Sequence, residues 1–151
     1  MTPTMQRIFA WSGVVMMVAF LVGFQIAHFV PPPSPTRSAA YIASYFQHHA
    51  TAIRAGLFIA GCAVALIATW SVAISIQLKR ISPKHSGYAY AELILGALLL
   101  VEFVVPIGIW EGLAFRPMDG AEITLRLNDV ASLMFVCLLY TSDAADDLTR
   151  V

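Results

Sequence analysis

The segment Tyr88–Trp110, YAYAELILGALLLVEFVVPIGIW, decides the fold class of this chain. It contains two glutamates and no Lys or Arg, and a helix needs about 20 apolar residues to cross a bilayer core. Two further apolar runs precede it, Ile8–Val30 and Ala52–Leu78, and Arg54 is the single Lys, Arg, Asp or Glu in either. We therefore predict an all-α integral membrane bundle with three full transmembrane helices.

Composition agrees with this prediction and excludes several functions. The 151 residues are 59% hydrophobic and 12% charged, with no formal net charge, which is not the balance of a soluble domain. No basic stripe or phosphate-binding loop is present, so we expect no nucleic-acid partner. The cysteines Cys62 and Cys137 form no disulfide framework or metal motif. We predict no enzyme, no cofactor and no metal site.

Basic residues predict the orientation. Lys79, Arg80 and Lys84 lie in the short connection 79–87, which carries no acid. The positive-inside rule places this loop and the N-terminus on the cytoplasmic side of the membrane. The proline run at 31–33 follows the first apolar run where a signal peptide would have small residues, so we predict a retained helix.

The first loop has a helical pattern of its own. Ser34 and Pro35 fit an N-cap followed by proline at the first helical position. Apolar residues then recur at helical spacing: Ala39, Ile42, Ala43 and Phe46. We predict a short amphipathic helix over 36–50 at the outer interface that either stands alone or runs into the second membrane helix. It serves as a connector or as a lid.

Glu102 is the main candidate for a functional group. It lies near the middle of the third apolar run, where an ionisable side chain is costly and a functional candidate by default. Pro106 lacks the amide that would bond the carbonyl of Glu102, so we predict a helix kink there. The carboxyl could hold a proton, a cation or a polar partner, or form a structural hydrogen bond. Glu92, nearer the cytoplasmic end, is expected to reach water or the basic loop.

Small residues in the second run predict close helix packing. Gly56 and Ala60 belong to one row spaced by four, and Gly61 and Ala65 begin another. Such spacing lets helix backbones approach. We expect an internal packing face rather than a dimer interface.

The four histidines are His28, His48, His49 and His85. Imidazoles can ligate haem or metal ions, but the spacing of these residues defines no site. The weakest hypothesis for the protein is a haem-binding redox subunit that uses His28 with His48 or His49.

The end of the chain has an unusual sequence. Residues Cys137–Asp146 can be back-translated into a DNA string that matches the transposase mosaic-end adapter of sequencing libraries. We therefore expect a transmembrane domain over 1–136 and a non-native tail over 137–151, with a fourth helix truncated at 127–136. The other predicted helices span 8–30, 52–78 and 88–110.

Four short stretches carry a family resemblance: RIFAWSG at 7–13, PPPSP at 31–35, ISIQLKRI at 74–81 and EFVVP at 102–106. They resemble a group of uncharacterised small multi-pass membrane proteins of actinobacteria, over about residues 2–136. The resemblance implies a longer protein with further hydrophobic helices, and it implies no activity.

Two main hypotheses for function follow. The first is a non-enzymatic helical partner or assembly subunit, which has the lipid bilayer and other membrane proteins as partners. The alternative is a small proton-coupled or cation transporter that uses Glu102.

Overall fold

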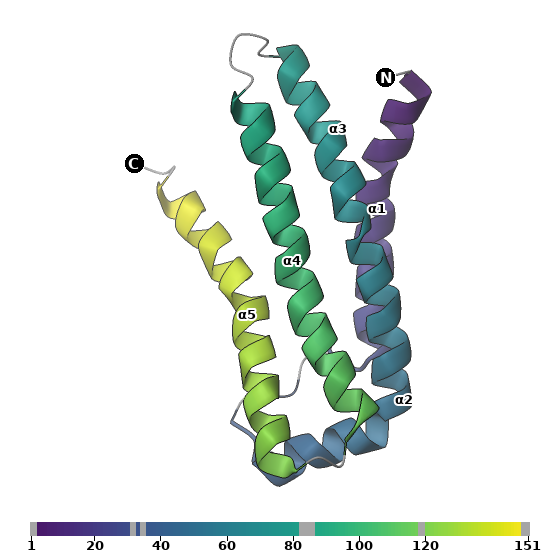
Figure 1. Ribbon diagram of the computed structural model, residues 1–151, viewed down its shortest axis with the longest axis vertical. Helices are drawn as coiled ribbons and strands as arrows, with labels where there is room; N and C mark the ends of the chain where they lie inside the picture. Colours follow the sequence, from purple (N-terminus) through teal and green to yellow (C-terminus); the bar gives the residue numbers. More distant parts are fainter. Residues whose placement is uncertain (1–2, 31–32, 34–35, 82–86, 118–119, 149–151) are drawn as a thin grey trace.

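Five helices make up the part of the chain that the computed structural model describes (Figure 1): α1 (Pro3–Ile26), α2 (Ala39–Val64), α3 (Leu66–Ile81), α4 (Gly87–Phe115) and α5 (Ala121–Leu148). The structure describes residues 3–30, 33, 36–81, 87–117 and 120–148, with side chains from Thr4 onward and up to Cys137 in α5. These residues contain no strand, which confirms the predicted all-α fold.

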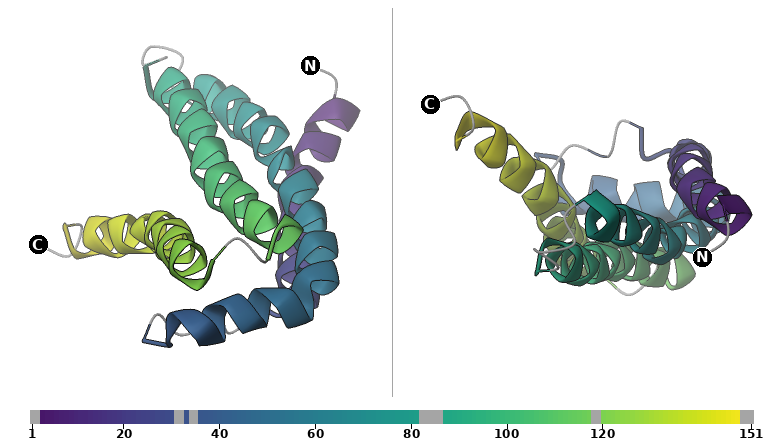
Figure 2. Two further views of the ribbon diagram at one scale, coloured as in Figure 1. Left: turned by 60° about the horizontal axis from the view of Figure 1, so that its bottom comes forward. Right: turned by 90° about the horizontal axis from the view of Figure 1, so that it is seen from above.

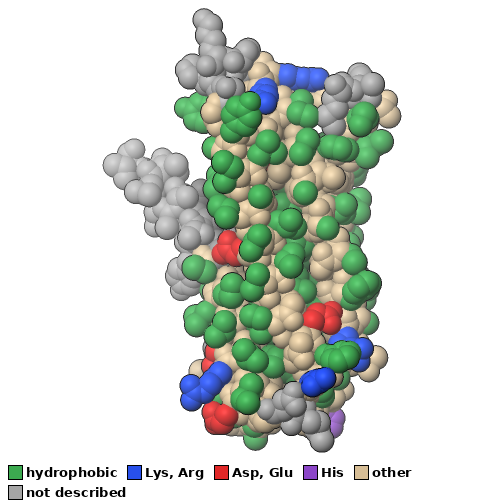
Figure 3. All heavy atoms as spheres, viewed as in Figure 1, with side chains coloured by type: hydrophobic (Ala, Val, Ile, Leu, Met, Phe, Trp, Pro, Cys, Tyr) green, Lys and Arg blue, Asp and Glu red, His purple; other side chains and the backbone are tan. Residues whose placement is uncertain are grey.

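Within the described residues, three helical stretches are long and apolar enough to cross a membrane, as the sequence predicted: Thr4–Ile26, Ala39–Ile81 and Gly87–Phe115. Hydrophobic side chains cover most of the visible face, and the Lys and Arg side chains gather toward its two ends (Figure 3). The start of α1, the end of α3 and the start of α4 share one end of the bundle (Figure 1). Three such apolar stretches are compatible with a multi-pass membrane protein, and the side on which the termini lie stays a prediction.

Helix α2 contains both the predicted interfacial helix and the beginning of the second membrane helix. The sequence did not decide whether these two were separate or continuous. It begins at Ala39, where the hydroxyl of Ser38 accepts a hydrogen bond from the amide of Tyr41 at 3.4 Å. The predicted cap at residues 34–35 lies outside the described residues. The first part of α2 lies across one end of the bundle, and the helix then turns to run along α4 (Figures 1 and 2). The predicted interfacial helix is therefore the beginning of the second span.

The second span is not one continuous helix, contrary to the prediction for 52–78. A turn at Ala65 separates α2 from α3. The amide of Ala68 bonds the carbonyl of Ala65 at 3.4 Å, an i to i+3 bond that replaces the α-helical pattern locally.

Close backbone contact joins α1 to α2. A Cβ added to Gly23 would lie 2.5 Å from the carbonyl oxygen of Gly56 and 2.8 Å from the amide nitrogen of Ala60. All three residues are buried. The row of Gly56 and Ala60 thus lies in the α1–α2 contact, where small residues let backbones approach.

The second small-residue row is divided between two environments. Gly61 faces α4, since a Cβ added there would lie 3.7 Å from Ile107. Ala65 is exposed at the turn between α2 and α3, so it makes no packing contribution in the described structure.

Helix α5 begins earlier than predicted. It starts at Ala121 rather than at 127 and remains helical to Leu148. Gly120, with φ +99°, precedes it, and the hydroxyl and the amide of Thr124 both bond the carbonyl of Gly120, at 3.0 and 3.1 Å. These bonds explain how the charged segment 121–126 enters the helix. From that start, α5 diverges from α4 along its length (Figure 1).

Candidate functional site

A polar hollow of about 380 Å³ lies between α3 and α4 on the outside of the bundle. Its lining includes both candidate carboxyls, together with a serine, a tryptophan and apolar side chains: Trp70, Ser71, Glu92, Leu95, Gly96, Leu98, Leu99 and Glu102. Leu95 and Leu98 are 63% and 59% exposed. The hollow therefore opens on the surface that lipid would contact.

Glycine at position 96 lets α3 approach α4 at this hollow. A Cβ there would collide with the hydroxyl of Ser71, which is buried at 4% exposure. The Ser71 side chain hydrogen-bonds Glu92, one turn before Gly96. The second carboxyl oxygen of Glu92, Oε2, is buried and has no hydrogen-bond partner among the described residues. One oxygen of this carboxyl is therefore left for a further donor.

Among the described residues, Glu92 lies beside Ser71 rather than beside Lys79 or Arg80. We expected it to reach water or the basic loop, and that expectation stays a prediction. Two of the basic residues contact other groups: the ammonium of Lys79 lies 4.4 Å from the ring centre of Tyr90, and Arg80 donates to the Gln6 side chain at 2.8 Å. Lys84 lies outside the described residues.

Glu102 is half-buried and lines the same hollow. Helix α4 stays helical on both sides of the buried Pro106, and the kink expected there stays a prediction. Ser75, on the facing helix α3, donates to the carbonyl of Ala89 at 2.8 Å rather than to Glu102.

The chemistry available in the hollow is that of oxygen ligands. Glu92, Glu102 and Ser71 provide two carboxyls and a hydroxyl, and no Lys or Arg is among the lining residues that the structure describes. Such a set can hold a proton, bind a cation or accept hydrogen bonds from a cationic side chain.

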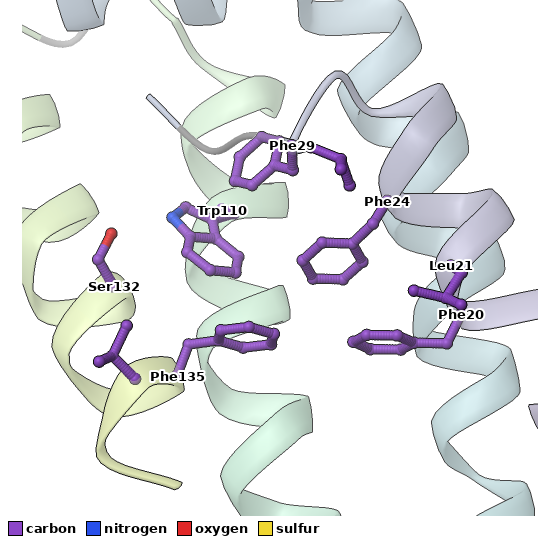
Figure 4. Close-up of a pocket in the computed structure, with 9 residues that line it drawn as sticks. Phe20, Leu21, Phe24, Phe29, Trp110, Ser132 and Phe135 are labelled. Carbon is purple, nitrogen blue, oxygen red and sulfur yellow. The ribbon is translucent and has the colours of Figure 1, made fainter. Parts of the chain in front are cut away.

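A second hollow, of about 300 Å³, is lined by apolar and aromatic side chains. Phe20 and Phe24 point from α1 toward Phe135 of α5 and Trp110 of α4 (Figure 4). The ring centres of Phe24 and Phe135 are 5.4 Å apart, so stacked rings bridge two helices that diverge. The sequence pattern did not single out this cluster, because its members come from three separate helices.

A buried polar pair lies beside the aromatic cluster. The indole nitrogen of Trp110 donates to Asn128 Oδ1 at 3.2 Å, and both residues are 2% exposed. The sequence assigned the segment around Asn128 to the start of a helix. The bond instead ties α5 to α4 in the core, and only the tertiary fold reveals it.

Arg54, the one basic residue inside an apolar run, lies near the other end of α4. Its guanidinium is 5.0 Å from the ring centre of Phe115 and interacts electrostatically with Glu111. The bilayer cost of this charge is reduced by both neighbours.

Two of the histidines, His28 and His49, lie side by side at the end of the bundle where α1 ends. The ring centres of His28 and His49 are 4.8 Å apart, His48 is exposed, and His85 lies outside the described residues. Axial ligands on opposite faces of one haem would have ring centres about 6 Å apart, given usual metal–imidazole bonds. The observed pair is therefore not arranged as two haem ligands.

Comparison of the chain with protein-family models, with curated proteins and with solved structures gave no match.

Proposed function

We propose that this protein is a non-enzymatic helical subunit of a membrane assembly, and that a partner helix docks over the hollow between α3 and α4. The observation that carries the proposal is the placement of Glu92 and Glu102 in one hollow on the lipid-facing side of the bundle. We further propose that the assembly lies in a bacterial plasma membrane, with the N-terminus and the 79–87 loop in the cytoplasm.

The energetic argument starts from the cost of exposed carboxyls. A charged side chain near the centre of a bilayer costs about 2.5–3.5 kcal/mol on insertion scales. Ser71 supplies one hydrogen bond to the Glu92 carboxyl, while Glu92 Oε2 has no hydrogen-bond partner among the described residues. A donor from another helix would offset this cost, because hydrogen bonds to a charged group are among the stronger ones. The hollow therefore favours a partner with a basic or amide side chain at this depth.

Site-specific photo-crosslinking in intact cells tests the proposal. A photoreactive amino acid replaces Leu95, which lines the hollow, or Val101, which is equally exposed on α4 but outside the lining. We expect a discrete crosslinked product from position 95, and its loss when Glu92→Gln is added. Equal products from both positions, or a product that survives Glu92→Gln, would contradict docking at the hollow.

A second candidate function is transport of protons or a cation through the same carboxyls. Three oxygen-bearing side chains in one hollow favour it. Purified protein in vesicles should then show proton or cation flux that Glu102→Gln abolishes. Glu122→Gln, a change at an exposed acid at the start of α5, is the control and should leave the flux intact. Flux unaffected by Glu102→Gln excludes this role.

A further inference from the structure

We propose that His28 and His49 bind a divalent transition-metal ion such as Cu²⁺, Ni²⁺ or Zn²⁺. The two imidazoles come from the end of α1 and from α2, where α2 crosses the end of the bundle. This site is separate from the hollow between α3 and α4 and does not depend on the function proposed for it.

The spacing of the two rings is that of two ligands on one ion. A metal bonded to one nitrogen of each imidazole at about 2.1 Å would lie about 3.2 Å from each ring centre. Ligand angles of roughly 90–110°, usual for square-planar and tetrahedral ions, then place the ring centres about 4.5–5.2 Å apart. The observed separation of His28 and His49 is 4.8 Å, with the ring planes tilted by 46°. This separation lies within the range for two imidazoles bound to one ion.

The backbone holds His28 in an uncommon conformation. Its φ is +58°, in the left-handed region that glycine usually occupies at the end of a helix. The amides of His28 and Phe29 bond the carbonyls of Gln25 and Phe24 at 3.1 and 2.9 Å, which closes α1 in a Schellman arrangement. Histidine keeps a side chain here where glycine would be less strained, and such an outlier supports a functional role.

Tyr45 connects both histidines. Its hydroxyl donates to the carbonyl of His28 at 2.5 Å, and its ring centre is 4.9 Å from that of His49. Because the hydroxyl is engaged with a carbonyl, Tyr45 is a positioning residue in this arrangement, like the outer-shell partners of other metal sites.

The ion would keep open coordination positions. No third His, Cys, Asp or Glu completes a cluster with this pair in the described part of the chain, so water would occupy the remaining positions. His28 is exposed and His49 is half-buried, which lets an ion enter from the aqueous side. Imidazole is a suitable ligand for Cu, Ni and Zn, and it has little preference for Mg or Ca.

The test uses the full chain, purified in detergent without a polyhistidine tag and stripped with a chelator. Titration with CuCl₂ is followed by calorimetry and by electron paramagnetic resonance. We expect one strong site per chain with nitrogen hyperfine structure. His28→Ala and His49→Ala should each weaken binding at least about tenfold, while His48→Ala, at the exposed neighbour on α2, should leave it unchanged.

Two further variants separate ligation from folding. His28→Gly keeps the left-handed backbone while removing the imidazole, so it should be folded, as judged by circular dichroism, and still lose the strong site. Tyr45→Phe should reduce the affinity while one ion still binds. Binding that persists in folded His28→Gly, or that falls equally in His48→Ala, would show adventitious binding by surface histidines and overturn the proposal.

Discussion

At the residue scale, His28 shows how a single backbone angle constrains the chain. A residue with a Cβ pays about 1–2 kcal/mol in the left-handed region, although His tolerates it better than most. The Tyr45 hydroxyl fixes the carbonyl of the same residue. Glycine at this position would favour the stability of the fold, whereas histidine supplies an imidazole at the cost of backbone strain.

We predict that His28→Gly raises the free energy of unfolding by about 0.5–1 kcal/mol, because glycine adopts the positive φ of +58° without a Cβ clash. Thermal or denaturant unfolding in detergent measures the change. His48→Gly, within α2, is the control and should lower stability by a similar amount. A loss of equal size in both variants would contradict the assigned strain.

The bond between Trp110 and Asn128 allows a second test at this scale. Trp110→Phe leaves the buried Asn128 amide without its donor, so we expect a loss of about 1–3 kcal/mol. Adding Asn128→Leu should recover part of this loss, since both polar partners are then removed. If the double variant is less stable than the sum of the single changes, the bond does not explain the cost.

At the element scale, the close approach of α1 and α2 depends on glycine. Gly56 of α2 meets the backbone of α1, whereas nothing lies within 4 Å of a Cβ added to Gly112 of α4. Replacement of glycine by alanine should therefore change the free energy of unfolding in opposite directions at the two positions.

Gly56→Ala should destabilise the bundle by about 1–3 kcal/mol through overpacking, and Gly112→Ala should stabilise it by about 0.5–1 kcal/mol through helix propensity. Parallel unfolding curves in one detergent compare them. An equal gain in both variants would mean that α1 and α2 are not in close backbone contact.

Hydropathy predicted the elements well because membrane spans are long and nearly uniform. The three spans, and the helical spacing of Ile42 and Phe46 before the second, follow directly from composition. The turn at Ala65 and the early start of α5 at Ala121 did not, because no Pro or Gly marks the first and charged residues obscured the second.

The candidate site was predicted only in part, for a related reason. Glu102 was visible as an isolated acid in an apolar run, and Glu92 as a second acid nearer the cytoplasmic end of that run. The contact of Glu92 with Ser71 depends on how closely α3 approaches α4 at Gly96, which is a tertiary property. The pairing of His28 with His49 likewise needs α2 to cross the end of α1.

At the scale of the whole molecule, the bundle has two chemically distinct ends. Lys79 and Arg80 lie at the end that holds the N-terminus, and the crossing part of α2 lies at the other (Figure 1). We predict that a membrane-impermeant thiol reagent added to intact cells labels Ser38→Cys but not Lys79→Cys. Cys62→Ser and Cys137→Ser provide the background, since both native thiols are exposed. The opposite labelling pattern would reverse the orientation.

The crossing part of α2 has a consequence for biosynthesis. It carries the buried residues Ile42 and Phe46. Helix α2 packs against α4 and α5 as well as α1, and Gln47 donates to the carbonyl of Pro117 at 3.1 Å. A ribosome makes those partners only after it has made α2 and α3. We therefore expect the nascent segment to rest in the headgroup layer, its apolar side against lipid, until the later helices insert. Closure of this end would then be among the last events of assembly.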